Sequence, residues 1–124
     1  MRRITRGAAA LVLVTAAVAT VGTGTAQAND KPVYGCPGGA VCIYPEGAAM
    51  ESSTPTDIFY SYGPHNLSNQ YGYHVVLNNQ YGGAGATAQL CTGYNGVNCV
   101  ATIQMNYNVN YNLTPINSIV LNRP

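Results

Sequence analysis

The sequence predicts an all-β domain, built as a sandwich of two Greek-key halves and stapled by disulfides. Beyond Pro45 no apolar period of 3.6 residues persists, and short apolar runs alternate with Gly, Asn, Ser and Thr, which is typical of strands joined by turns. The four cysteines form two close pairs, and two similar segments recur about 45 residues apart. Together these features favour two packed β halves over a helical fold.

Residues 1–28 have the pattern of a signal peptide. Arg2, Arg3 and Arg6 precede an apolar run over 8–21, and Ala26-Gln27-Ala28 has the small-x-small form of a cleavage site. A membrane anchor is the alternative, but the run is short for a hydrocarbon core of about 30 Å. We therefore expect a secreted, extracellular protein that begins at residue 29 and has no membrane attachment after cleavage.

The remaining residues, 29–124, form one small domain with few charges. These residues include two basic side chains, Lys31 and Arg123, and four carboxylates, so two minus four gives a formal net charge of −2. A nucleic-acid-binding protein would need a basic face, which this composition does not supply. We expect one monomeric domain over 29–124, with halves at about 33–80 and 81–124, whose small core needs additional stapling.

The cysteines supply this stapling. An even number of cysteines in an exported chain is most simply explained by disulfides, and we pair Cys36 with Cys42 and Cys91 with Cys99. Three pairings are possible: local bridges stabilise by about 2.5 kcal/mol each, and a long bridge by about 4 kcal/mol. Zinc is the rival explanation, although the spacings C-x5-C and C-x7-C do not match common zinc sites.

Strands are expected wherever a short β-prone run lies between turn residues. The turns are predicted at Gly63-Pro64, Asn78-Asn79, Gly82-Gly83 and Asn95-Gly96. The segment 46–57 has no clear pattern and is expected to be a loop or a short helical turn. The predicted strands are 41–44, 58–62, 73–77, 86–91, 99–104, 105–111 and 117–121.

An internal repeat supports two similar halves. Asn66-Leu67-Ser68 precedes Val75-Val76-Leu77-Asn78, and Asn112-Leu113-Thr114 precedes Ile119-Val120-Leu121-Asn122. Each half also opens with a cysteine pair followed by an apolar strand. A chance match between short strand segments is the alternative, since Val and Leu are common in strands.

The most specific motif is Cys36-Pro37-Gly38-Gly39-Ala40-Val41-Cys42-Ile43-Tyr44. This motif, the later cysteine pair, the signal peptide and the size resemble the secreted actinobacterial inhibitors of peptidase inhibitor family I36, typified by the Streptomyces metalloproteinase inhibitor. The resemblance implies a βγ-crystallin-like fold of two Greek keys and inhibition of a secreted protease, in particular a metalloprotease. It also implies that the second disulfide presents the bond between Cys91 and Thr92 to the protease.

A loop of this kind has a physical rationale of its own. A disulfide holds the segment in its bound shape, so that little conformational entropy is lost when the segment docks on a protease. Tyr94 and Val97 could fill pockets of the target. The alternative is that this disulfide only staples a hairpin. The candidate inhibitory loop comprises Cys91, Thr92, Gly93, Tyr94, Asn95, Gly96, Val97 and Asn98.

Metal and cofactor sites are not expected. Microbial βγ-crystallin relatives often bind calcium near the end of each half, but in residues 113–118 apolar side chains and Pro115 replace most of the oxygen donors that calcium needs. The first half offers Asn66, Ser68 and Asn69 there, without a carboxylate.

A glycan- or cell-wall-binding module is a second functional hypothesis. The run 106–112 alternates strictly, so that as a strand it would place Tyr107, Val109 and Tyr111 on one face and four asparagines on the other. Amides beside tyrosines could bind a sugar, although a half-buried strand explains the same pattern. A structural or toxin-like crystallin-fold protein without inhibitory activity is a further alternative.

Catalysis is not expected, because the chain has few acids, bases or nucleophiles and neither H-E-x-x-H nor G-x-S-x-G. We interpret His65 as a turn residue beside Pro64 and His74 as a strand residue. The protein is therefore predicted to act by binding, with no enzymatic activity, and protease inhibition is the leading hypothesis.

Overall fold

The computed structural model describes residues 31–124 as an all-β domain, and the predicted signal peptide, 1–28, lies outside this range. Within residues 31–124, eight strands and two short 3-10 turns make up the regular structure. The strands are β2 (Ala40–Ile43), β3 (Asp57–Phe59), β4 (Gly63–Asn66), β5 (Tyr73–Asn79), β6 (Ala88–Cys91), β7 (Cys99–Ile103), β8 (Asn108–Asn112) and β9 (Ser118–Leu121). The 3-10 turns are η2 (Met50–Ser52) and η3 (Tyr94–Gly96).

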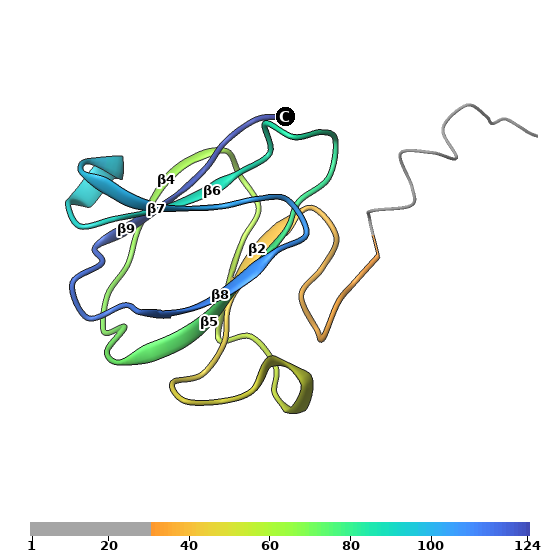
Figure 1. Cartoon of the computed structure of the whole chain (residues 1–124), viewed down its shortest axis with the longest axis horizontal. Helices are drawn as coiled ribbons and strands as arrows, with labels where there is room; N and C mark the ends of the chain where they lie inside the picture. Colours follow the sequence, from red (N-terminus) through yellow and green to blue (C-terminus); the bar gives the residue numbers. More distant parts are fainter. Residues whose placement is uncertain (1–30) are drawn as a thin grey trace, which may run out of the picture.

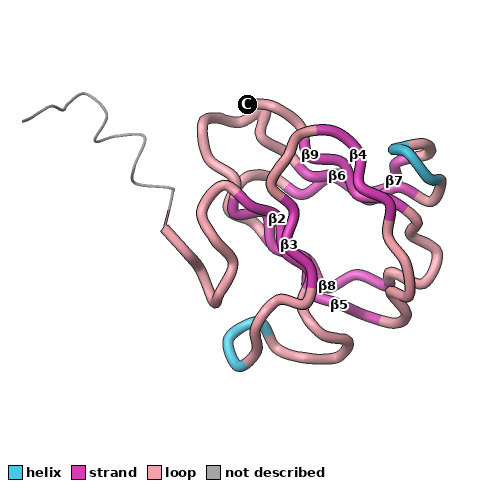
Figure 2. Tube along the Cα trace, turned by 180° about the vertical axis from the view of Figure 1, so that it is seen from behind, coloured by secondary structure: helices cyan, strands magenta, loops and turns pink. Residues whose placement is uncertain are grey.

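The strands form two four-stranded antiparallel sheets that face each other (Figure 2). One sheet has the order β3-β2-β5-β8 and the other β4-β9-β6-β7. The third strand of each half thus joins the sheet of the other half: β4 pairs with β9, and β8 pairs with β5. The two halves of the chain are therefore interlocked, and neither half builds a complete sheet alone.

The main core lies between the sheets and follows the strand alternation. Val41 and Ile43 of β2 point inward, as do Ala88 and Leu90 of β6, because residues two apart share a face. Side chains from β5, β7 and β9 and from the loops after β4 and β8 complete this core: Val76, Ile103, Ile119, Leu121, Leu67, Leu113 and Ile116.

A second cluster covers the outer face of β2 and β5, next to the first disulfide. Cys36 and Cys42 are bonded and buried there with Tyr44, Met50 and Leu77. The second disulfide joins Cys91 and Cys99. The predicted local pairing is therefore the one that the structure contains, and all four cysteines are used in disulfides rather than in a zinc site.

The Asn-Leu triplets of the internal repeat occupy equivalent places. Leu67 follows β4 and Leu113 follows β8; both are buried in the main core. The Leu67 N–H donates to Asn117 O, just before β9, and the Leu113 N–H donates to Gly72 O, just before β5. Each Leu therefore fastens the third strand of one half beside the fourth strand of the other.

In the second part of the repeat, the residues that occupy equivalent places in the structure differ by one position from those matched in the sequence. Val76 pairs with Ile43 and Ile119 pairs with Leu90, and all four face the main core. Val75, which the sequence alignment matched with Ile119, faces the outer cluster instead. A shift of one residue reverses the face of every side chain, so the inward-facing match is the physically meaningful one.

Strand β4 was missed in the sequence, where Gly63-Pro64 was interpreted as a turn. In the structure β4 is an edge strand, and an edge strand tolerates a Pro that cannot donate a ladder hydrogen bond. His65 lies within β4 opposite Ile119 rather than in a turn. The predicted strand 58–62 accordingly ends at Phe59.

Two further boundaries differ from the prediction. The Asn78-Asn79 pair does not form a turn but ends β5, with both residues buried. The predicted strand 105–111 begins only at Asn108, because Asn106 adopts a φ of 70° in the turn between β7 and β8. The first difference arises because the Asn78 and Asn79 side chains make tertiary hydrogen bonds, and the second because Asn readily adopts a positive φ in a turn.

Candidate functional site

The most distinctive candidate site is the clasped loop, which we define as residues 92–98 closed by the disulfide between Cys91 and Cys99. It connects β6 to β7 at the opposite side of the sandwich from the first disulfide (Figures 1 and 2). Within the loop, the Thr92 N–H donates to Asn98 O and the Gly93 N–H to Val97 O, both at 2.9 Å. The loop is thus a closed hairpin end with its own backbone hydrogen bonds.

The turn inside the loop depends on residues that accept positive φ values. Asn95, Gly96 and Asn98 have φ values of 60°, 77° and 57°. Asn and Gly adopt this left-handed region far more readily than other residues. The predicted turn at Asn95-Gly96 is therefore present, as part of η3.

Strand β4 of the first half holds the tip of the clasped loop. The Asn95 N–H donates to Asn66 Oδ1 at 2.8 Å, and Asn66 Nδ2 donates to Asn95 Oδ1 at 3.1 Å. The Asn66 side-chain amide is thus joined to the backbone N–H and to the side-chain oxygen of Asn95, across 29 residues of sequence. The tip cannot move without breaking both.

The start of β9 holds the base of the loop. Ser118 Oγ accepts from the Gly96 N–H at 2.9 Å and donates to Gly93 O at 2.6 Å. Asn117 Nδ2 donates to Thr92 O at 2.8 Å. Three side chains outside the loop therefore fix its shape in addition to the disulfide.

The loop presents two large hydrophobic side chains to solvent. Tyr94 is 57% exposed and Val97 is 55% exposed. Asn95 and Asn98 are also exposed, whereas Thr92, Gly93 and Gly96 are half-buried. An aromatic and an aliphatic side chain thus project from a backbone that has little freedom to rearrange.

The bond between Cys91 and Thr92, which the family resemblance implies as the protease-facing bond, is held within the sheet. Cys91 is buried, and its carbonyl accepts from the Asn117 N–H at 2.9 Å. The Thr92 N–H donates to Asn98 O, and Thr92 O accepts from Asn117 Nδ2. The backbone groups that a protease would bind on either side of this bond are already paired inside the protein.

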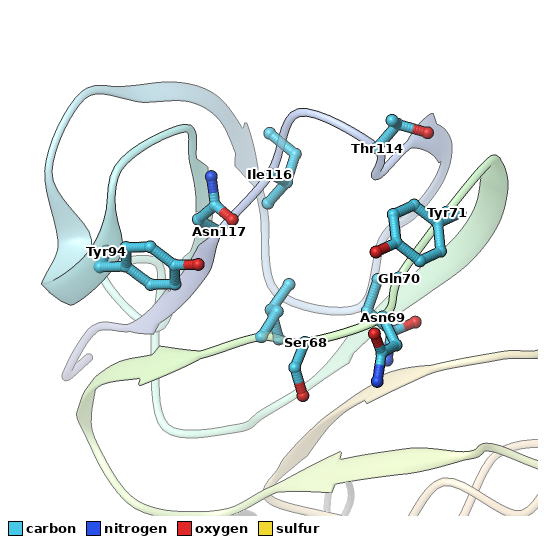
Figure 3. Close-up of a pocket in the computed structure, with 9 residues that line it drawn as sticks. Ser68, Asn69, Gln70, Tyr71, Tyr94, Thr114, Ile116 and Asn117 are labelled. Atoms are coloured by element: carbon cyan, nitrogen blue, oxygen red, sulfur yellow. The ribbon is translucent and has the colours of Figure 1, made fainter.

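A hollow of about 200 Å³ lies next to the clasped loop (Figure 3). Tyr94 of the loop and Tyr71 stand on opposite sides of it, with their hydroxyl ends turned toward it. Buried Leu67 and Ile116 give it an apolar base. The rest of the lining is polar and uncharged: Ser68, Asn69, Gln70, Thr114 and Asn117.

The clasped loop and the hollow contain no Asp, Glu, Lys, Arg or His. This neutral surface gives no general acid, base or charged anchor. It is instead suited to uncharged or apolar groups of a partner.

The two histidines lie in different sheets, His65 in β4 and His74 in β5. The ring nitrogens of His74 lie 2.6 Å from Tyr44 O and 2.9 Å from Tyr71 O, inside the protein. His65 packs against Phe59, with ring centroids 5.0 Å apart. Both histidines thus contribute to packing and to local hydrogen bonding, and His74 is the strand residue predicted from the sequence.

In the second half, the region considered for calcium has its hydroxyl groups engaged. Thr114 Oγ1 accepts from the Gly72 N–H, and Ser118 Oγ bonds within the clasped loop. Within residues 31–124 no group of three or more His, Cys, Asp and Glu side chains is arranged to hold a metal ion.

The asparagine-rich strand was predicted correctly in its alternation from Asn108 onward. Val109 and Tyr111 pack on the main core, and the asparagines at 108, 110 and 112 are exposed. Tyr107, however, lies before the strand and is exposed rather than sharing the face of Tyr111. The exposed row of amides is therefore limited to these three asparagines, and Asn106 and Tyr107 lie outside the strand.

Sequence reasoning missed the residues that hold the clasped loop and line the hollow beside it. Asn66 and Thr114 belonged to the repeat, which was the only available signal for them. Nothing in the sequence linked Asn117, Ser118 or Tyr71 to the second disulfide. The contacts of Asn117 and Ser118 arise from the pairing of β9 with β6, and Tyr71 precedes β5, which pairs with β8.

Comparisons of this chain with protein-family profiles, with curated proteins and with solved structures found no match. In the described part of the chain, no helix has the length and apolar character needed to cross a membrane. Two disulfides are typical of proteins that fold in an oxidising compartment.

Proposed function

We propose that this protein is a secreted protease inhibitor with a βγ-crystallin-like fold, and that it binds its target through the clasped loop. The observation that carries the proposal is the loop itself: Tyr94 and Val97 project from a segment that is closed by a disulfide and held by Asn66, Asn117 and Ser118. A segment ordered before binding loses little conformational entropy on docking.

The strand order supports the crystallin-like part of the proposal. In each half the fourth strand lies beside the first, β5 beside β2 and β9 beside β6, as in a Greek key. The third strand crosses to the other sheet in both halves, which gives the two halves the same path. The predicted signal peptide and the two disulfides support secretion.

The hydrogen bonds around Cys91 and Thr92 favour contact through the tip of the loop rather than through this bond. Tyr94 and Val97 are the side chains available to enter apolar pockets of a protease. The hollow between Tyr94 and Tyr71 could accept an apolar side chain of the protease in return. A metalloprotease with a pocket for bulky apolar groups is therefore the first target to examine.

The proposal is tested by measuring inhibition constants of the protein without residues 1–28 against a secreted metalloprotease, a serine protease and a cysteine protease. We expect inhibition of the metalloprotease. The double variant Tyr94→Ala/Val97→Ala should weaken it at least about 100-fold, because two central anchors of an interface each contribute about 2 kcal/mol or more. Tyr107→Ala removes an equally exposed tyrosine from another turn and should change little.

Two results would contradict the proposal. The first is that none of the three enzymes is inhibited with an inhibition constant below about 10 μM. The second is inhibition that the double variant retains in full while both proteins are folded, because the contact surface would then lie elsewhere.

A further inference from the structure

A second hollow, of about 230 Å³, lies away from the clasped loop. Three segments that are distant in the sequence form it: the first disulfide loop, the connection between β3 and β4, and the residues that follow β5. We call it the tyrosine hollow, and its lining residues are Gly38, Gly39, Tyr60, Tyr62, Gln80 and Tyr81. We propose that the tyrosine hollow binds one ring of a neutral saccharide.

The three tyrosines supply flat apolar faces that solvent can reach. Tyr60 is 61% exposed, and Tyr62 and Tyr81 are also exposed. A tyrosine offers a ring face for stacking and a hydroxyl for hydrogen bonding, so that one side chain can contact both the C–H face and the hydroxyls of a sugar. None of the three tyrosines belongs to either core cluster, so core packing does not account for them.

Gly39 of the first disulfide loop makes room for Tyr81. A Cβ on Gly39 would lie 3.1 Å from Tyr81 Cε2, and Gly39 also has a φ of 88°, which disfavours any other residue. The Gly39 N–H donates to Asn79 O at 2.8 Å, which fixes the loop against the end of β5. The disulfide between Cys36 and Cys42 closes this loop, so one wall of the hollow is rigid before a ligand binds.

Gln80 has a side-chain oxygen that lacks a hydrogen-bond donor among residues 31–124. Its side chain is only 3% exposed, and its Nε2 donates to Thr87 O and Asn78 Oδ1, both at 3.1 Å, and to Ala86 O. Because carbonyl oxygens only accept, these contacts identify the amide nitrogen, and the other end of the amide is Oε1. Among residues 31–124 no donor bonds to this Oε1, and a buried acceptor without a donor is costly.

The chemistry of the lining selects among ligands. No charged side chain lines the tyrosine hollow, so the lining itself offers no cation to an anionic ligand. Arg123 stacks on Tyr62, with its guanidinium 4.5 Å from the ring centroid, and is not part of the lining. A proline-rich peptide also binds tyrosine-lined grooves, but proline has no N–H to donate to Gln80 Oε1. A sugar hydroxyl donates, and a sugar ring stacks on tyrosine faces.

The size of the hollow limits the ligand to a single ring. Sites that enclose a drug-sized molecule measure roughly 300–1,000 Å³, and the tyrosine hollow is smaller than this. The natural ligand would therefore be one unit of a neutral oligosaccharide or polysaccharide whose other units remain in solvent.

The test titrates the protein without residues 1–28 with chitotriose, cellotriose and a proline-rich peptide, followed by NMR. We expect saturable binding of at least one saccharide, with the largest shifts at the Gly38 and Gly39 amides and the Gln80 side-chain amide. Tyr60→Ala/Tyr81→Ala should weaken binding at least tenfold. The matched variant Tyr73→Ala/Tyr107→Ala, which removes two exposed tyrosines outside the hollow, should bind like the wild type.

Three outcomes would overturn the proposal: no saccharide binding with a Kd below about 10 mM, shifts centred away from the tyrosine hollow, or binding of the peptide alone. The spectra of the folded variants show in each case that the surface, and not the fold, was changed. The clasped loop shares no residue with this hollow, so loss of saccharide binding would leave the protease proposal unaffected.

Discussion

Asn78 is a buried polar residue in the main core. It occupies the inward-facing position of β5 that corresponds to Leu121 of β9, and it is fully buried. Its Nδ2 donates to Ala86 O and Ile103 O, both at 2.9 Å, and its Oδ1 accepts from the backbone and side-chain N–H groups of Gln80. Because Ile103 belongs to the other sheet, this amide joins the two sheets at one end of the sandwich.

We expect Asn78→Ala to lower the free energy of unfolding by about 3 kcal/mol, since buried carbonyl oxygens lose their donors and a cavity forms. Urea unfolding followed by circular dichroism measures this change. Asn110→Ala, at an exposed position of β8, should change the value by no more than about 0.5 kcal/mol. Equal effects of the two variants would show that the Asn78 amide does not join the sheets.

At the scale of elements, the segment before β2 is held against the outer face of its sheet. The Tyr44 hydroxyl donates to Val33 O at 3.2 Å and to Tyr34 O at 2.9 Å, and Asn79 Nδ2 donates to Cys36 O at 3.0 Å. The first disulfide fixes the end of the same segment. The outer cluster therefore depends on the Tyr44 hydroxyl remaining protonated, because a phenolate cannot donate.

Burial raises the pKa of Tyr44 above its ordinary value of 10.0. The folded state then holds the Tyr44 proton more tightly than the unfolded state, so its stabilisation is complete below about pH 10 and is lost as the pH rises further. The loss is at most about 1.4 kcal/mol per pH unit. We expect Tyr44→Phe to remove this part of the alkaline slope of the unfolding free energy, measured by urea titrations at pH 8 to 11.

Tyr107→Phe serves as the control for this measurement. Tyr107 is exposed and its hydroxyl bonds to no group in residues 31–124, so this variant should keep the alkaline slope of the wild type. If Tyr44→Phe also keeps that slope, the Tyr44 hydroxyl does not couple protonation to folding.

The strands with regular alternation could be predicted from the sequence, and those with special contacts could not. The all-β class, β7 and most of β5, β6 and β9 follow from β-prone runs between turn residues. Strand β4 could not be predicted because it contains Pro64, which a strand tolerates only at a sheet edge, and the sequence does not show which strands lie at an edge. The end of β5 could not be predicted because the side-chain amides of Asn78 and Asn79 form hydrogen bonds with residues that are distant in the sequence.

At the scale of the whole molecule, the exchange of β4 and β8 between the sheets places parts of both halves at the clasped loop. Asn66 comes from the first half, whereas Asn117 and Ser118 come from the second, and all three hold the same loop. The loop itself could be predicted from the spacing of Cys91 and Cys99. The residues that hold the loop could not be predicted, because the sequence does not show how β4 is positioned against the hairpin of the other half.

The order of the strands in the first half explains why the tyrosine hollow was not predicted. Tyr60, Gln80 and Tyr81 lie near one another only because β3 and β5 both flank β2 and bring their ends beside the first disulfide loop. In the sequence, scattered tyrosines are common in β proteins and carry no information on which of them share a surface.

Backbone amide exchange of the free protein tests the central claim most directly, namely that both halves hold the clasped loop in one shape before any target binds. The account predicts that the Thr92, Gly93, Asn95 and Gly96 amides exchange at least about 100-fold more slowly than in an unstructured peptide, equivalent to an opening free energy of about 2.7 kcal/mol. In Asn66→Ala the Asn95 amide should exchange at least tenfold faster while amides of β2 and β5 stay protected, whereas Asn112→Ala, the repeat-related control, should leave the loop unchanged. Exchange of the loop amides in the wild type at the rate of an unstructured peptide would contradict the account.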